Sequence, residues 1–241
     1  MLSPLTVLKR YWGYESFRPL QREIIDAVLA GNDVLGILPT GGGKSITYQV
    51  PALLKDGITI VVSPLIALMN DQVQSLRKKG IPAAAIHAGQ SLKKRSEILH
   101  KAYRKEIKLL YVSPERFALS DYPWYESLPV ALIAIDEAHC ISQWGHDFRP
   151  AYKKLSLLRE AFPEVPVIAL TATATPHVKQ DIINTLKFKK GYKVFETSVY
   201  KENLSISVIS ASWWYEHLLV VLKNLKGGSA LVYVRSRLKT E

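Results

Sequence analysis

Two segments of the chain carry the residue types that phosphate chemistry requires. The first is residues 38–45, LPTGGGKS, which follows an apolar run and precedes a helical pattern. Its consecutive glycines, Gly41–Gly43, let backbone N–H groups turn toward an anion, and the start of a helix adds partial positive charge. Lys44 would reach the β- and γ-phosphates of a nucleotide, and the Ser45 hydroxyl would ligate Mg²⁺.

The second segment begins with two adjacent carboxylates, Asp136 and Glu137, at the end of the apolar run ALIAID. Asp136 can hold the Mg²⁺ shell opposite Ser45, and Glu137 is placed to orient or deprotonate an attacking water. The strict phosphate-loop pattern has glycine where this chain has Leu38, so a glycine-rich turn with an incidental lysine remains the alternative. The two segments together favour nucleoside triphosphate hydrolysis.

The second segment continues as CISQWGHDFRP, which carries Trp144, His146, Phe148 and Arg149. Aromatic side chains stack on any base, at roughly 1–3 kcal/mol per base. Arg149 would add a phosphate contact or cation–π stacking. Because this segment holds both the carboxylates and the aromatic residues, we expect a reaction that is coupled to a flat, charged ligand. The alternative is a hydrophobic staple that pins the loop to its own domain.

The elements that must position these segments alternate between strand and helix. Several apolar runs lack polar alternation, as strands do when helices cover both faces of a parallel sheet. The pattern predicts an α/β fold, a doubly wound and mainly parallel sheet. Strands are expected near 33–38, 59–64, 83–87, 108–113, 131–136, 165–172 and 193–197, and helices at 18–30, 45–54, 66–79, 91–105, 150–161 and 176–186.

Polar residues follow three of these strands at the edge where such sheets bind ligands. Thr40 and Gly41 follow the first strand, Asp136 ends the fifth, and Thr171 and Thr173 lie in or after the sixth. The sequence therefore predicts one site at three strand ends.

After about residue 197 the pattern restarts. A strand is expected at 204–210, a helix at 213–225 and a strand at 229–236. One such unit cannot bury both faces of a sheet. We therefore expect one domain over residues 1–197 and the truncated start of a second over residues 198–241.

The net charge of +11 arises from 32 Lys and Arg against 21 Asp and Glu. A chain this basic usually meets a polyanion, nucleic acid or an anionic membrane surface, although a solvated basic surface is the plainer explanation. The single cysteine, Cys140, excludes a disulfide framework and a cysteine-rich zinc site. No signal-peptide pattern or bilayer-spanning run is expected. The basic focus consists of Arg77, Lys78, Lys79, Lys93, Lys94, Arg95, Lys101, Arg104, Lys105 and Lys108.

The motif set resembles the RecQ DNA helicases of superfamily 2. PTGGGKS and DEAH resemble the superfamily's nucleotide motifs, and CISQWGHDFRP resembles the aromatic-rich loop of RecQ proteins. YWGYESFRPLQREII, at residues 11–25, resembles their adenine-recognition motif. VVSPLIALMNDQV, LLYVSPERF and ALTATAT resemble further motifs of the first helicase lobe, and SALVYVRSRLKTE resembles the first motif of the second lobe.

The resemblance implies a RecA-like lobe that binds ATP and Mg²⁺ and drives 3′→5′ translocation on single-stranded DNA and duplex unwinding. Tyr14 and Arg18 would sandwich the adenine, and Gln21 would hydrogen-bond its edge. His139 and the segment Thr171–Thr173 would couple nucleotide state to DNA. The phosphates and metal would be held by Thr40, Gly41, Gly42, Gly43, Lys44, Ser45 and Asp136, with Glu137 as general base, and single-stranded DNA would be sensed by Trp144, His146, Phe148 and Arg149.

The resemblance also sets what this polypeptide alone is expected to do. In the family the second lobe supplies an arginine finger, worth on the order of 10³–10⁵ in turnover, and YKENL at 200–204 stands where an Arg-Pro-Asn sequence is usual. We expect the chain to bind nucleotide, to hydrolyse it slowly at best and not to unwind duplex DNA. A superfamily 2 RNA helicase and an inactive nucleotide- or DNA-binding fragment remain alternatives. The expected location is the cytoplasm with the nucleoid in a bacterium, or the nucleus in a eukaryote.

Overall fold

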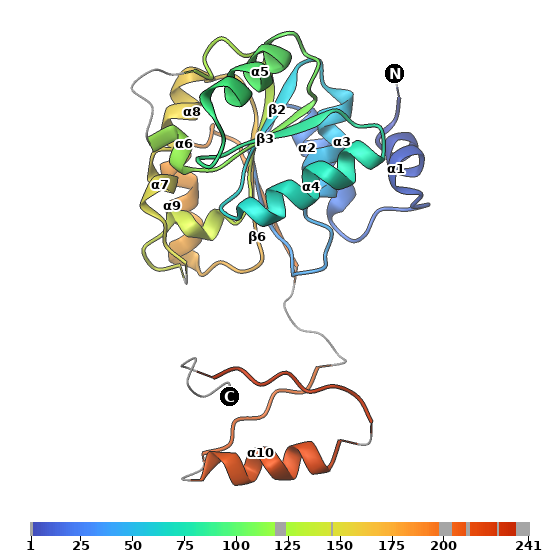
Figure 1. The fold of residues 1–241 in the computed structure, drawn as a ribbon, viewed down its shortest axis with the longest axis vertical. Coiled ribbons are helices and arrows are strands. Elements are labelled where there is room, and N and C mark those ends of the chain that lie inside the picture. The colour runs from blue at the N-terminus through green and yellow to red at the C-terminus, as the bar shows by residue number, and fades with distance from the viewer. Residues whose placement is uncertain are drawn as a thin grey trace. The chain divides into compact units, whose positions relative to one another are not determined.

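The computed structural model describes residues 2–118, 124–145, 147–197, 204–210, 213–225 and 227–234. They fall into two compact units, Met1–Val199 and Tyr200–Glu241. The first unit is a parallel sheet with helices on both faces (Figure 1). The α/β doubly wound fold predicted from the sequence is confirmed.

The sheet has the strand order β3-β4-β2-β5-β6-β1-β7, and every neighbouring pair is parallel. All seven predicted strands are present, each within a few residues of its expected bounds. They are β1 (Val34–Ile37), β2 (Ile58–Val62), β3 (Ala83–Ile86), β4 (Leu109–Val112), β5 (Val130–Ile135), β6 (Val167–Thr171) and β7 (Lys193–Glu196).

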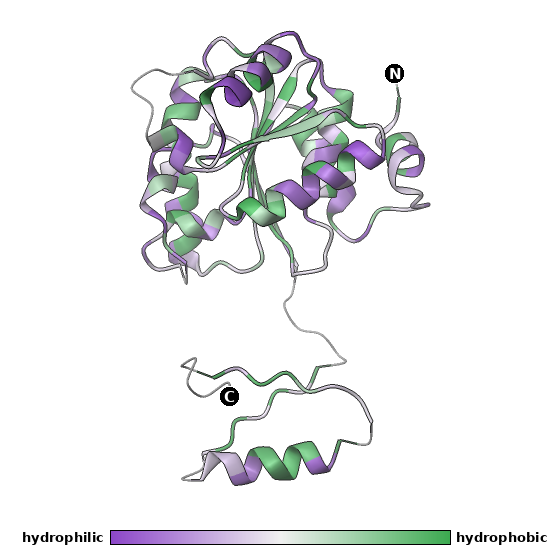
Figure 2. Ribbon diagram, in the orientation of Figure 1, coloured by the Kyte–Doolittle hydropathy of each residue, from purple (hydrophilic) through white to green (hydrophobic). Residues whose placement is uncertain are grey.

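The helices divide between the two faces of the sheet. The helices α2, α3 and α4 pack on one face through Ile24, Tyr48 and Met69, and α5, α8 and α9 pack on the other. Figure 2 shows the apolar strands between helices whose outer sides are polar. The bounds are α1 (Pro4–Trp12), α2 (Gln21–Leu29), α3 (Ile46–Leu54), α4 (Ile66–Lys78), α5 (Leu92–Tyr103), α6 (Glu115–Ala118), η1 (Ala138–Ile141, a 3₁₀ helix), α7 (Pro150–Lys153), α8 (Ser156–Ala161) and α9 (Pro176–Thr185).

Two of the predicted helices differ from the structure. The helix expected at 18–30 begins only at Gln21, because Leu20 before it has a left-handed backbone with φ of 63°. The helix expected at 150–161 is split into α7 and α8. Between them Lys154 N–H bonds the carbonyl of Ala151, a tight turn that interrupts the α-helical ladder.

Helix α1 was not predicted, although its capping residues are visible in the sequence. The Ser3 side chain accepts a hydrogen bond from Thr6 N–H at 3.1 Å, and Pro4 occupies the first turn. Gly13 ends the helix in the left-handed conformation. The helix packs through Val7 and Leu8 beside α3.

The second unit contains α10 (Trp214–Lys223), which confirms the helix expected at 213–225. The strands expected at 204–210 and 229–236 are wrong over the residues that the structure describes, 204–210 and 229–234. A strand requires ladder hydrogen bonds to a neighbour, and the described part of this unit offers no strand to pair with. Ile206 and Val208 are 90% and 95% exposed.

Across the described ranges, the helices fall short of the length and apolarity that crossing a bilayer requires.

Candidate nucleotide site and nucleic-acid interface

A cavity of about 760 Å³ opens at the carboxyl ends of β1 and β5. Its walls come from four parts of the chain: the segment from the end of α1 to the start of α2, the loop after β1 with the start of α3, helix α4 through Leu68 and Gln72, and the acidic pair after β5. Because β6 lies between β5 and β1 in the sheet, the ends of these three strands adjoin. The sequence prediction of one site at three strand ends is therefore met for the first two segments.

The loop after β1 has the backbone that a phosphate cradle requires. Gly41 and Gly43 have φ of 79° and 74°, which other residues rarely adopt. A Cβ on Gly42 would lie 2.8 Å from the Pro39 carbonyl oxygen. Helix α3 begins directly after Ser45, and its first residue, Ile46, lines the cavity. The positive end of the α3 dipole therefore lies at the cavity wall, while the Ile46 N–H donates to the Gly43 carbonyl at 3.1 Å. Lys44 Nζ donates to the Leu38 carbonyl at 3.4 Å.

The surroundings of the acidic pair destabilise the ionised form of Asp136. Burial and the neighbouring Glu137 charge raise the pKa of Asp136 to about 6, while Glu137 N–H and the Lys44 charge oppose the rise. The Glu137 N–H donates to Asp136 Oδ1 at 3.0 Å, and Tyr152 donates to the Asp136 carbonyl at 2.9 Å. Glu137 itself has a left-handed backbone, with φ of 47°.

These residues fit a bound Mg²⁺. A half-buried carboxylate whose ionised form is penalised gains from a divalent cation placed beside it. Asp136 and Ser45 line the same cavity and both offer oxygen ligands. The described residues hold no group of three or more His, Cys, Asp or Glu side chains that could hold a metal by themselves. Mg²⁺ commonly takes one or two protein ligands and completes its shell with phosphate and water.

The predicted adenine-binding residues line the same cavity. Tyr14 is 53% exposed. Arg18 donates through Nη1 to the Gly41 carbonyl. The Gln21 amide accepts from Arg18 N–H at 2.9 Å and donates to the Gly42 and Gly43 carbonyls at 3.2 and 3.0 Å. Gln21 therefore ties α2 to the phosphate loop, and adenine recognition stays a prediction.

The predicted coupling residues form one cluster behind the acidic pair. His139 Nδ1 lies 3.0 Å from Thr171 Oγ1 and 3.3 Å from Glu137 Oε2. The Thr171 hydroxyl donates to the Thr173 carbonyl at 3.1 Å. Side chains of η1 and of β6 are thus linked through His139, within hydrogen-bond distance of the predicted general base.

The aromatic loop presents its residues unequally. Trp144 is 80% exposed, whereas Phe148 is half-buried with Lys153 Nζ 5.3 Å from its ring centre. Arg149 pairs with Asp147 at 3.1 Å and donates through Nη1 to the Pro64 carbonyl at 3.1 Å. Arg149 thus anchors the loop to the segment after β2. His146 lies outside the described residues.

A second cavity, of about 460 Å³, brings several of these residues together. Trp144 and Gly145 of the aromatic loop, His139 of η1 and the segment 173–175 all line it. Two of the predicted coupling residues, His139 and Thr173, therefore line one hollow together with the exposed Trp144, separate from the first cavity.

Sequence reasoning missed a buried polar network beside the nucleotide cavity. Gln49 Nε2 donates to Gln72 Oε1 at 2.9 Å and to the Tyr111 hydroxyl at 3.2 Å. The Tyr111 and Tyr48 hydroxyls lie 3.3 Å apart, and burial raises the pKa of Tyr111 to about 12. The available signal was a lone glutamine within the apolar run ITYQVPALL. The Ser142–Asp181 hydrogen bond, at 2.5 Å, was missed too.

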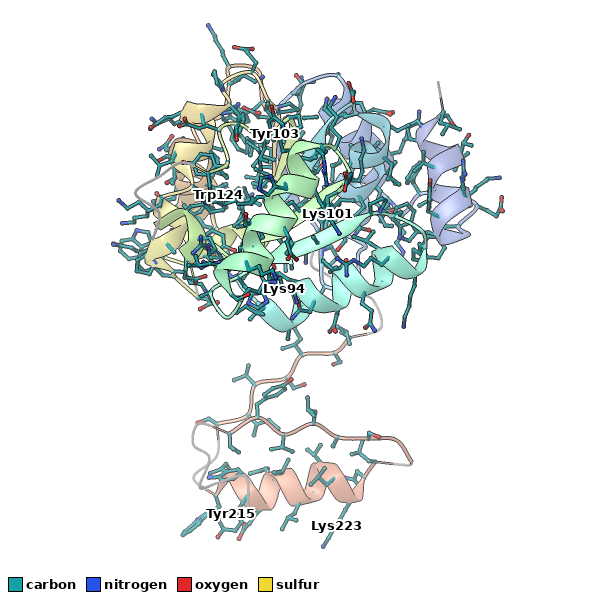
Figure 3. All side chains as sticks on the ribbon, turned by 45° about the horizontal axis from the view of Figure 1, so that its top comes forward. Lys94, Lys101, Tyr103, Trp124, Tyr215 and Lys223 are labelled. Carbon is teal, nitrogen blue, oxygen red and sulfur yellow. The ribbon has the colours of Figure 1, made fainter. Side chains whose placement is uncertain are left out.

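The basic focus is partly structural. Arg77 Nε donates to the Ala83 carbonyl at 2.7 Å, and Lys108 Nζ donates to the carbonyls that follow α3. Lys94 and Lys101, in contrast, are exposed on α5 (Figure 3). Only such exposed charges are available to a polyanion.

Curated relatives are ATP-dependent DNA helicases. The chain is 44% identical over 238 residues to the ATP-dependent DNA helicase RecQ of Haemophilus influenzae, a match that covers 98% of this chain and 38% of the relative. It is 47% identical over 209 residues to the ATP-dependent DNA helicase Q-like 4B of Arabidopsis thaliana, covering 83% of this chain and 18% of that protein. The chain thus spans well under half the length of these relatives.

A solved structure supports the fold alone. The helicase MrfA superposes with a TM-score of 0.72 at 17% identity, over 98% of this chain and 39% of that one. The predicted resemblance to RecQ proteins is confirmed by the homology to RecQ-type DNA helicases. The family model for DEAD/DEAH box helicases matches residues 18–182, more than half of the chain. The chain therefore belongs to the DEAD/DEAH box helicase family.

Proposed function

We propose that this chain forms the ATP-hydrolysing lobe of a RecQ-type, ATP-dependent DNA helicase. One observation carries the proposal: the glycine-rich loop and the acidic pair, 92 positions apart from Lys44 to Asp136, line one cavity. The RecQ homology supplies the substrate class. The 3′→5′ polarity follows from the resemblance.

In the proposed nucleotide complex, the backbone N–H groups of residues 41–45 and the start of α3 hold the phosphates. Lys44 contacts the β- and γ-phosphates, and Tyr14, Arg18 and Gln21 take the adenine. Ser45 and Asp136 hold Mg²⁺, which when bound supplies positive charge that offsets the phosphate charge. For Gln21 to bind adenine, part of its hydrogen bonding to the loop carbonyls must be exchanged for the base.

In the proposed hydrolysis step, Glu137 accepts a proton from the attacking water. The water oxygen forms a bond to the γ-phosphorus as the bond to the bridging β–γ oxygen breaks, which releases ADP and inorganic phosphate. The contact of Glu137 with His139 supports the further proposal that the base is linked to Thr171 and Thr173.

The DNA is proposed to lie over the exposed face of the aromatic loop. Trp144 stacks on a base, and Phe148 and Arg149 fix the loop, with His146 assigned by the resemblance alone. Residues 1–197 would be the first lobe and residues 198–241 the beginning of a second RecA-like lobe. Duplex unwinding by the whole motor, in the nucleoid of a bacterium or in a eukaryotic nucleus, belongs to the same proposal.

Nucleotide and strand binding test the proposal directly. A fluorescent ATP analogue with Mg²⁺ should bind the chain, and a labelled oligothymidylate should bind with a strong dependence on salt. Unlabelled single-stranded DNA should displace the label more readily than RNA of matched length. Preferential displacement by RNA would favour an RNA helicase instead, and failure to bind the ATP analogue would contradict the nucleotide site.

A further inference from the structure

The turn that carries Trp144 is held tightly although the Trp144 side chain is 80% exposed. Ser142 is 1% exposed, and its hydroxyl accepts a hydrogen bond from Trp144 N–H at 3.1 Å. The same hydroxyl donates to Asp181 Oδ2 at 2.5 Å. Ser142 therefore connects the tryptophan backbone to a carboxylate on α9.

Gly145 closes the turn from the other side. Its N–H donates to the Ser142 carbonyl at 3.0 Å. A Cβ at this position would collide with the His139 carbonyl oxygen and lie 3.1 Å from the Ser142 carbonyl oxygen. The backbone at Gly145 thus packs so closely on η1 that it leaves no space for a side chain.

Helix α9 is the element that holds Ser142, and it begins directly after the segment that holds His139. Thr175 caps α9 by accepting from Val178 N–H at 3.4 Å, and α9 packs against η1. The 3₁₀ helix η1 is therefore attached to the β6–α9 unit at two points. His139 meets Thr171 at its start, and Ser142 meets Asp181 just beyond its end.

We propose that Asp181 is a positioning residue that, through Ser142, fixes Trp144 beside the second cavity for stacking on a nucleic-acid base. The inference rests on the proposed function, since it takes Trp144 to be a strand contact. A hydroxyl-to-carboxylate hydrogen bond is of the strong, charge-assisted kind. Because β6 and α9 are consecutive, a shift at Thr171 reaches Trp144 through Asp181 as well as through His139.

Asp181 lies on α9, outside the loop, so its hydrogen bond with Ser142 attaches the Trp144 turn to a different element. The clamp consists of the hydrogen bond from Trp144 N–H to Ser142 and the hydrogen bond from Ser142 to Asp181. It holds Trp144 through the backbone N–H and not through the aromatic ring. Loss of the carboxylate should therefore release the turn and leave the nucleotide cavity unaltered, since Asp181 does not line that cavity.

The test compares Asp181→Ala and Asp181→Asn with the wild-type chain and with Gln180→Ala, an exposed neighbour bonded to Asn184 on the same helix. Hydrogen–deuterium exchange of the Trp144 and Gly145 amides reports the clamp. Fluorescence anisotropy of a labelled oligothymidylate reports strand affinity. Binding of the fluorescent ATP analogue and the thermal midpoint report that the lobe is intact.

We expect Asp181→Ala to speed exchange at Trp144 and to weaken strand affinity by about tenfold, as coupling through a single contact allows. Asp181→Asn, which keeps the shape, should show a smaller effect. Gln180→Ala should show none. In combination with Trp144→Ala, which removes the stacking ring, Asp181→Ala should weaken strand binding no further, because both changes remove one contact.

Unchanged exchange in both Asp181 variants would overturn the clamp. Faster exchange with unchanged strand affinity would overturn the positioning role, as would additive losses with Trp144→Ala. If Trp144→Ala itself left strand affinity intact, the DNA role in the proposed function would fail, and the positioning role with it. A loss in Trp144→Ala without one in Asp181→Ala would leave the proposed function standing and refute this inference alone.

Discussion

Each end of the sheet holds a carboxylate that is at least partly withdrawn from solvent, and the chain balances the two charges differently. At the amino end, Asp33 is fully buried and accepts from Arg159 Nη2 at 2.7 Å and from the N–H groups of Val167 and Lys189 at 2.8 and 2.6 Å. At the carboxyl end, Asp136 is half-buried beside Glu137, and its pKa is raised to about 6.

The difference distinguishes a carboxylate that stabilises the fold from one that we propose binds a ligand. The Asp33 charge is balanced by groups of the chain itself, which join β1 to α8, β6 and the connection before β7. The Asp136 charge is opposed by its neighbour and relieved only in part by Lys44. We therefore expect substitutions at the amino end to change stability and substitutions at the carboxyl end to change ligand binding.

The largest expected effect is a loss of folding stability when Asp33, at the amino end of the sheet, is replaced. Asp33→Ala leaves Arg159 buried without its partner, which typically costs about 3–5 kcal/mol of the free energy of unfolding. Chemical denaturation of the purified variant measures the loss. The matched control is Asp26→Ala, which removes an exposed pair with Arg22 and should cost less than about 1 kcal/mol. Equal losses in both variants would break the comparison.

The carboxyl end should respond in binding instead of in stability. Lys44→Ala removes a charged contact to phosphate, worth about 1.5–3 kcal/mol, so Mg²⁺–ATP affinity should fall by up to about 100-fold. The free energy of unfolding should change little. Isothermal titration calorimetry measures the affinity, with the exposed Lys79→Ala as control. An unchanged affinity would remove Lys44 from the phosphate site.

Asp136→Asn should stabilise the chain when no Mg²⁺ or nucleotide is present. The folded protein holds this proton more tightly than the unfolded chain does, so ionisation costs stability. The penalty is full above about pH 6 and absent below the ordinary value of 3.8. Urea unfolding should show a gain of about 3 kcal/mol at pH 7.5 that vanishes toward pH 4. A destabilised variant at pH 7.5 would mean that the chain already satisfies this charge.

The smallest expected effect concerns exposed charge on α5. Lys94→Ala or Lys101→Ala removes a cation that has no fixed partner in the described residues (Figure 3). If the lysine contacts a phosphate, oligothymidylate affinity should fall slightly and the slope of log affinity against log salt should drop by about one. Anisotropy titrations at several salt concentrations measure it. An unchanged slope would assign that lysine to the solvated surface.

The sequence was sufficient wherever the signal was local. Continuous apolar runs located all seven strands. The motifs put Lys44 and Asp136 after the strands β1 and β5, which only β6 separates in the sheet. The cap formed by Ser3 and Gly13 was equally local and was overlooked. Such features depend on residues that are neighbours in the chain, so they can be predicted from a single sequence.

The contacts that decide the roles of individual residues were not local. The partners Ser142 and Asp181 are separated by 39 positions, and Asp33 and Arg159 by 126. No periodicity marks such pairs, because they form only when distant elements pack. The strand patterns after residue 197 failed for the related reason that alternation supplies no pairing partner.

The most direct test of the central claim is single-turnover ATP hydrolysis by this chain, with and without single-stranded DNA, against Glu137→Gln as the blank. The account predicts slow release of phosphate that exceeds the blank and rises when DNA is added. Release that Glu137→Gln leaves unchanged, or that DNA does not alter in the wild-type chain, would contradict a hydrolytic site coupled to the aromatic loop.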